Sequence, residues 1–160
     1  MRKWCGFTLP ELLVAIALTS LLLVLGMGMV RYQQERQVRL YAQTLYHDLK
    51  WAREEAITLN VPIVMTPFAN GQTTSDWCGG WLMYRDEHEA SVSDTATYVI
   101  IQPGIANCDI MLGSFPSCTY VRFLPQGMSD YQNGTFSVYA HHQLVAQIVM
   151  SQTGRVRYAA

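Results

Sequence analysis

The first part of the chain carries a long apolar run without a single charge. Between Glu11 and Arg31 the sequence reads LLVAIALTSLLLVLGMGMV, at positions 12–30. At about 1.5 Å per residue, a helix of this run spans roughly 28 Å, enough for the hydrocarbon core of a bilayer. Arg2 and Lys3 precede the run, and the positive-inside tendency places that end in the cytoplasm. We therefore predict a transmembrane helix followed by an exported body.

A cleaved secretory signal is the alternative, because it also combines a charged start with an apolar stretch. The run is long for such a signal, and the residues VRYQ at positions 30–33 do not form a small-x-small cleavage site. Both features favour a retained helix.

The helical period continues beyond the apolar run. Thr8 and Glu11 have the spacing of a capping box at the start, and Asn60 and Pro62 supply stop signals at the end. We predict one helix from about Thr8 to Leu59. Its second half is amphipathic, since apolar residues recur there every three or four positions: Val38, Tyr41, Ala42, Leu45, Leu49, Ala52, Ala56 and Leu59.

From residue 61 onward the period changes to that of strands. Short β-branched or aromatic runs alternate with turn pairs such as Asn70-Gly71 and Thr153-Gly154. Seven strands are predicted: Pro62–Thr66, Gly80–Arg85, Thr97–Gln102, Thr119–Leu124, Thr135–Ala140, Leu144–Ser151 and Arg155–Tyr158. One long helix followed by these strands predicts an α+β fold, with an antiparallel β head laid against the apolar stripe of the helix.

Composition limits the function classes. The chain has 160 residues, of which 50% are hydrophobic and 14% charged, so we expect one ordinary domain and no disordered protein. A formal net charge of −1 excludes attraction of the whole molecule to nucleic acid, and any such binding must be local.

The N-terminal string KWCGFTLPE at positions 3–11, followed by the apolar run, resembles the class III signal of type IV pilins and type II secretion pseudopilins. The resemblance implies that a prepilin peptidase cuts after Gly6 and that Phe7 becomes the N-methylated first residue. It also implies that Glu11 meets the terminal amine of a neighbouring subunit, since a buried carboxylate needs a cationic partner. Pro10 departs from the commoner aliphatic residue and is expected to alter only the first turn.

The same resemblance implies a domain organisation and a location. Residues 1–6 would be the leader, 7–30 the transmembrane or filament-core helix, 31–60 the amphipathic half and 61–160 a β-rich periplasmic head, with 7–160 as the pilin domain. The protein would sit in the inner membrane with a cytoplasmic N-terminus and then enter a pilus or pseudopilus. Its partners would be other pilins or pseudopilins, the prepilin peptidase and inner-membrane lipid.

The head resembles a narrower group, the FimT/GspH minor pilins and pseudopilins. The matching pieces occur in order along the chain and are weak one by one: WAREEA at 51–56, GWL at 80–82, FLPQG at 123–127, NGTF at 133–136, and IVMS at 148–151 followed by TGRVR at 153–157.

Catalysis finds little support in the sequence. The histidines at positions 47, 88, 141 and 142 have no zinc-type spacing with the cysteines, and no phosphate loop or nucleophile elbow is present. The acidic group Asp86, Glu87, Glu89 and Asp94 lacks calcium-loop spacing, which favours a solvated loop over a cation site. We expect no enzyme activity, no metal and no cofactor.

Three cysteines would remain after removal of the leader, so one must be left over. We prefer a Cys108–Cys118 disulfide, because these two bracket a short loop with Gly113 and Pro116. Cys78 would then be free, buried or intermolecular, although sequence alone does not determine the connectivity.

The C-terminal end is basic within an otherwise acidic head. Arg155 and Arg157 are spaced i, i+2, so on a strand both guanidinium groups face the same side. His141 and His142 occupy a predicted neighbouring hairpin turn, and Gly154 would let a ligand backbone approach closely. Two planar cations on one face could clamp a phosphate, or they could merely keep a terminal strand soluble.

The resemblance bears on this choice, because Gly154-Arg155-Val156-Arg157 matches the glycine-arginine-x-arginine motif of FimT-type pilins, which bind DNA during natural transformation. It implies a minor pilin that binds double-stranded DNA non-specifically for uptake in competence. The alternative is a purely structural pseudopilin or pilus-priming subunit of a type II secretion system, without DNA binding.

Overall fold

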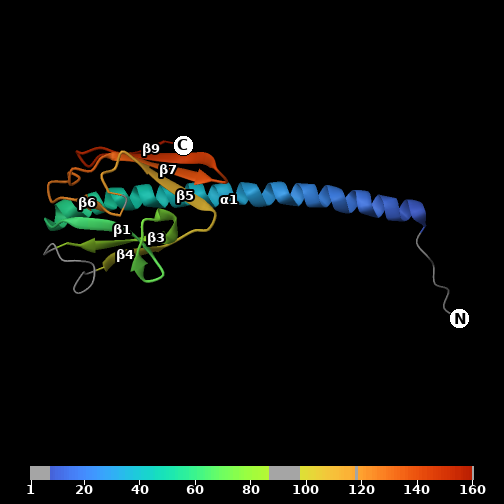
Figure 1. Ribbon diagram of the computed structural model, residues 1–160, viewed down its shortest axis with the longest axis horizontal. Coiled ribbons are helices and arrows are strands. Elements are labelled where there is room, and N and C mark those ends of the chain that lie inside the picture. The colour runs from blue at the N-terminus through green and yellow to red at the C-terminus, as the bar shows by residue number, and fades with distance from the viewer. Residues whose placement is uncertain (1–7, 87–97, 118, 160) are drawn as a thin grey trace. The chain divides into compact units, whose positions relative to one another are not determined.

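The computed structural model describes residues 8–86, 98–117 and 119–159, and the side chains of all of these except residues 25–30, 98 and 99. The chain divides into two compact units, residues 1–34 and residues 35–160. Figure 1 shows one long helix and a set of strands that surround the second part of that helix.

Helix α1 runs from Leu9 to Leu59, within one residue of the predicted span. At its start, the Thr8 backbone N–H donates to Glu11 Oε2 over 3.5 Å, which is the return contact of a capping box. At its end, Asn60 has a φ of +55° and turns the chain out of the helix. Within the described residues, no helix has the combination of length and apolar character that a membrane crossing requires.

The apolar stripe of α1 is the centre of the core in residues 35–160. All its members from Val38 to Ala56 are buried, and only Leu59, 36% exposed, departs from the prediction. The stripe packs against residues of both sheets in a single cluster, so burial rather than helix propensity holds this part of the helix in place.

The first sheet is antiparallel and built around β1 (Ile63–Ala69). Strand β3 (Gly80–Arg85) pairs with β1 and carries β4 (Tyr98–Pro103) on its other side. Strands β2 (Gln72–Thr73) and β6 (Val121–Phe123) pair with opposite ends of β1. A short 3₁₀ helix, η1 (Trp77–Gly79), leads into β3.

The second sheet is also antiparallel, in the order β5-β7-β8-β9. Its strands are β5 (Cys108–Gly113), β7 (Gly134–Ala140), β8 (Gln143–Met150) and β9 (Val156–Ala159). Alternate residues of β7 are buried, as expected for a sheet with one face on a core. The α+β class, with a long N-terminal helix packed on antiparallel strands, is confirmed.

All seven predicted strands correspond to observed ones, with shifts of a few residues at their ends; Thr97 lies outside the described residues. Strands β2 and β5 were not predicted. Strand β2 has only two residues, both exposed, and β5 is an edge strand whose outward positions carry Asp109 and Met111, without a clean polar alternation.

The predicted Cys108–Cys118 disulfide is wrong. Cys78 and Cys108 form the disulfide, with their Cα atoms 5.8 Å apart. Cys78 lies in η1 and Cys108 opens β5, so the bond joins the segment that leads into β3 of the first sheet to an edge strand of the second, across 30 residues of sequence. After Cys108, strand β5 runs extended at roughly 3.3 Å per residue. It leads the chain away from Cys108, which disfavours a disulfide between Cys108 and Cys118. Cys118 lies outside the described residues.

Candidate functional site

The glycine-arginine-x-arginine segment lies in the hairpin that joins β8 to β9. The Gly154 N–H donates to the Ser151 carbonyl over 2.9 Å, and the Ser151 N–H donates to the Arg155 carbonyl over 3.0 Å. Gly154 has a φ of +75° between these bonds. This is the pattern of a three-residue loop that ends in a left-handed residue, and that position favours glycine.

Gly154 was predicted to let a ligand backbone approach, and this assignment is wrong: the backbone that comes close belongs to the chain itself. Gly154 is buried. A Cβ on it would lie 2.0 Å from the Gly127 carbonyl oxygen and 2.9 Å from Arg53 Nε. The same carbonyl accepts a 2.8 Å hydrogen bond from Arg53 Nε. Helix α1, the loop after β6 and the β8–β9 turn therefore meet at Gly154.

Arg155 lies directly before β9 and Arg157 lies within it, and both reach solvent. Their side chains are exposed, whereas Val156 between them is buried, and Arg157 pairs across the ladder with Val149. The predicted placement on one face is confirmed, since both arginines line the same cavity.

That cavity is a cleft of about 660 Å³ between the second part of α1 and the β8–β9 hairpin. Besides the two arginines, Lys50 and Arg53 of the helix line it, and Glu54 is the one carboxylate among the described lining residues. Within the described residues, no ion pair involves any of the four cations. Four cations beside a single carboxylate leave an excess of positive charge that attracts an anion, and planar guanidinium groups suit phosphate.

Lys50 and Arg53 were missed as site residues. Their i, i+3 spacing off the apolar stripe places them on one side of the helix. That spacing was visible in the sequence, but nothing in it showed that the C-terminal hairpin would pack beside this side of α1.

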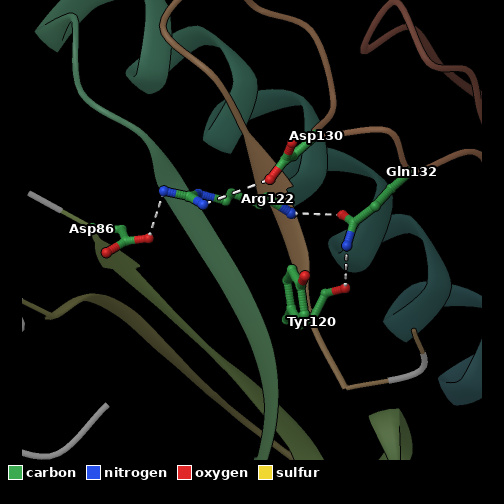
Figure 2. A network of polar contacts seen from close by, with 5 residues as sticks. All are labelled: Asp86, Tyr120, Arg122, Asp130 and Gln132. Atoms are coloured by element: carbon green, nitrogen blue, oxygen red, sulfur yellow. Dashed lines mark hydrogen bonds and ion pairs between the residues drawn. The ribbon is translucent and has the colours of Figure 1, made fainter. Parts of the chain in front are cut away.

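The other arginines of the head are neutralised. Figure 2 shows Arg122 of β6 between two carboxylates: its Nη2 lies 3.0 Å from Asp86 Oδ2 and its Nη1 3.5 Å from Asp130 Oδ2. Gln132 accepts from the Arg122 N–H and donates to the Tyr120 carbonyl, which ties β6 to the following loop. Arg85 lies 3.8 Å from Glu55.

A second polar cavity, of about 590 Å³, adjoins this network and is lined by Tyr84, Asp86 and Arg122 together with several threonines. Burial raises the pKa of the Tyr84 hydroxyl, and the negative charge of Asp86 raises it further. Tyr84 is therefore a neutral hydrogen-bonding group here. The predicted acidic loop continues from Asp86 into residues outside the described part of the chain.

The histidine pair lies apart from the arginines and lines a different cavity. His141 and His142 form the two-residue β7–β8 turn, as predicted, with φ angles of +49° and +64°. They line a separate cavity of about 220 Å³ with Asp109 of β5. Arg157 pairs with Val149 near the far end of β8, six residues beyond Gln143, which corresponds to roughly 20 Å along an extended strand.

The predicted processing site is described only in part. Gly6 and Phe7 lie outside the described residues. Glu11 lies in the first turn of α1, where its carboxylate also accepts from the Thr8 hydroxyl over 3.4 Å. In the described ranges, no group of three His, Cys, Asp or Glu side chains is placed to hold a metal ion.

Two family models match the chain. The model of the type II transport protein GspH matches residues 41–154, and the model of the prokaryotic N-terminal methylation motif matches residues 1–27. The first covers well over half of the chain. None of the curated protein sequences matches.

Solved structures of similar fold come from both kinds of filament system. The type IV minor pilin FimU of Pseudomonas aeruginosa has a TM-score of 0.63 at 17% identity, over 81% of this chain and 92% of that one. The minor pseudopilin EpsH from the type II secretion system of Vibrio cholerae has a TM-score of 0.55 at 11% identity, over 77% and 95% of the two chains. The chain therefore belongs to the GspH family of type II transport proteins and is a minor pilin or pseudopilin with the pilin-like α+β fold.

Proposed function

We propose that this pilin-like subunit binds DNA non-specifically through Arg155 and Arg157 and serves DNA uptake. The observation that carries the proposal is the cleft beside β9, in which both arginines are exposed and unpaired within the described residues. Arginine forks suit phosphate oxygens, and such contacts bind without reading sequence.

The proposal includes the route by which the subunit reaches the filament. The peptidase cuts after Gly6, Phe7 is methylated, and the apolar run at 12–30 holds the subunit in the inner membrane until it assembles with other pilins. The match to the N-terminal methylation motif supports this route. A carboxylate at Glu11 then has a cationic partner in the neighbouring subunit's terminal amine, which offsets the cost of its burial.

The double variant Arg155→Gln/Arg157→Gln tests the DNA claim. We expect it to remove most binding to a mixed-sequence duplex, because two phosphate contacts are lost. Binding is measured by fluorescence anisotropy with the mature full-length chain in non-ionic detergent micelles. The matched control is Arg36→Gln/Arg39→Gln, which makes the same charge change on exposed positions of α1 outside the cleft. Equal binding by wild type and the Arg155/Arg157 variant would contradict the claim.

A second candidate function is a purely structural subunit of a type II secretion filament, whose head contacts only other pseudopilins. The match to the GspH model favours it, as does the acidic balance of the head, where seven acidic residues face four basic ones beyond residue 56. An outcome in which the wild-type chain does not bind duplex DNA, while the protein still assembles with its neighbours, supports this candidate.

A further inference from the structure

The basic cleft has two walls, and only one of them is the C-terminal strand. Arg155 and Arg157 form one wall, and Lys50 and Arg53 of helix α1 line the other. Counted over the described residues that line it, four cations and Glu54, the cleft has a formal charge of +3 in a chain whose net charge is −1. The positive potential is therefore concentrated where helix and hairpin meet.

Lys50 is available for a ligand. Its side chain is exposed, and its ammonium lies 5.7 Å from the centre of the Tyr46 ring. A cation–π contact of this kind is weak at the surface and uses none of the three N–H donors. In the part of the chain that the structure describes, no carboxylate pairs with it.

Arg53 is held by one hydrogen bond and keeps other N–H donors for a ligand. Its Nε donates to the Gly127 carbonyl over 2.8 Å, and that carbonyl packs directly on Gly154. One of the five guanidinium N–H donors is used in this bond, which leaves four. Arg53 therefore holds the turn that presents Arg155 and also adds charge to the cleft.

The lining indicates which part of a nucleic acid the cleft suits. Besides the charged residues, it contains the hydroxyls of Ser151 and Thr153, the small Gly154 and two valines. None of the described residues that line it is aromatic. Single-stranded DNA is usually held by stacking its bases on aromatic side chains, whereas a duplex exposes its phosphates to cations and hydroxyls.

We propose that Lys50 and Arg53 of α1 are part of the DNA site, and that the helix–hairpin cleft takes the phosphate backbone of duplex DNA in preference to a single strand. This inference rests on the proposed DNA binding and deepens it. The site is then a four-cation clamp built from the second half of α1 and the C-terminal hairpin, with Lys50 as a direct phosphate contact.

Salt dependence measures the number of contacts. Each neutralised phosphate adds about 0.9 to the slope of log affinity against log salt, so four contacts give about 3.6 and two give about 1.8. Between about 50 and 200 mM salt, four contacts predict an affinity loss of about 150-fold and two only about 12-fold. The experiment titrates a 20-base-pair duplex and the matching single strand with the mature chain in non-ionic micelles.

Lys50→Gln is the decisive variant, because Lys50 is exposed and makes no hydrogen bond that the fold needs. We expect weaker binding and a slope of log affinity against log salt that is reduced by about 0.9. The same increase in salt then lowers the affinity about 40-fold. Arg39→Gln is the control, with the same charge loss on the same helix outside the cleft. Arg53→Gln should also lower the slope, and Arg53→Lys should restore it.

The outcomes separate the two claims. If Arg155→Gln/Arg157→Gln removes binding while Lys50→Gln behaves as Arg39→Gln, the helix wall is not part of the site and this inference fails, whereas the proposed function stands. If the wild type binds no DNA, the proposed function fails. Equal or tighter binding of the single strand overturns the duplex preference. In a parallel titration with phosphatidylglycerol added to the micelles, Lys50-dependent lipid binding without duplex binding assigns the cleft to lipid and also overturns the inference.

Discussion

Two arginines of the head, Arg122 and Arg155, have the same side chain in opposite settings. Arg122 is 20% exposed and lies between two carboxylates. Arg155 is exposed and lines a cleft with three other cations. A charge that is buried and paired serves the fold, and breaking such a pair is costly. An exposed, unpaired cation contributes little to the fold and remains available to a ligand.

At Gly154, both the positive φ of the backbone and the close approach of neighbouring atoms exclude a larger residue. We expect Gly154→Ala to lower the free energy of unfolding by about 2 kcal/mol or more, since the added Cβ meets the Gly127 carbonyl in a left-handed conformation. DNA binding should fall as well, because the displaced turn carries Arg155. Urea unfolding and duplex titration of the variant measure both effects.

Gly71→Ala is the matched control for this variant. Gly71 has a φ of +81° in the β1–β2 turn, and a Cβ there meets nothing within 4 Å. Its substitution carries only the conformational cost, roughly 1 kcal/mol. Equal destabilisation by the two variants would contradict the packing role of Gly154.

The sequence predicted the residues of the site only in part. Strand alternation was enough to place Arg155 and Arg157 on one face. The i, i+3 spacing of Lys50 and Arg53 gave no sign of the hairpin beside them, because that contact joins residues about 100 positions apart. The sequence placed the histidine pair in a hairpin turn but did not specify which end of β8 that turn occupies relative to the arginines.

At the scale of elements, two polar contacts fix α1 to the η1–β3 region. The Tyr41 hydroxyl donates to the Trp77 carbonyl over 3.0 Å, and the Trp81 indole N–H donates to Asp48 Oδ2 over 2.8 Å. Burial raises the pKa of the Asp48 carboxyl, and the Trp81 hydrogen bond opposes that rise. The carboxylate thus orients the helix at some cost in desolvation.

The raised pKa of Asp48 predicts a pH dependence of stability. The folded state binds this proton more tightly than the unfolded chain, so the stabilisation is present below the unfolded pKa of about 3.9 and is lost as pH rises through the folded pKa. Asp48→Asn keeps an acceptor for Trp81 without titrating. The wild type should therefore lose stability relative to this variant as pH rises above about 4, as urea unfolding at a series of pH values would show.

Asp109→Asn controls for the general effect of removing a carboxylate, because Asp109 is exposed on β5. A wild type that gains stability relative to Asp48→Asn over the same pH rise would contradict the account, since it would mean that the pKa of Asp48 is lowered.

Elements with strong periodicity were predictable from the sequence. The stripe from Val38 to Ala56 gave the helix, and β7 and β8 followed from their β-branched and aromatic residues. Strand β5 was not predicted, because its residues CDIMLG at 108–113 neither alternate cleanly nor form a continuous β-branched run. Strand β5 forms because it pairs with β7, and this tertiary contact is not visible in the local sequence.

At the scale of the head, two sheets share one core around α1. Trp77 of η1 and Phe136 of β7 meet edge to face, with ring centres 5.2 Å apart, and the Cys78–Cys108 bond lies in the same region. The sequence pattern predicts antiparallel strands on a helix but not their division between two sheets. Without that division, a bond from η1 to β5 could not be predicted from the spacing of the cysteines.

The charge of the whole molecule bears on where DNA could bind. The chain is weakly acidic, and Arg85 and Arg122 are paired with carboxylates. Under the proposed function, we therefore expect a duplex to be repelled over most of the head and attracted only at the cleft.

The central claim is that this chain is a processed filament subunit, and its N-terminus tests the claim most directly. Mass spectrometry of the protein purified from its native membrane should give a chain that starts at an N-methylated Phe7. A chain that still starts at Met1, or one cut after the apolar run at residues 12–30, would contradict the account.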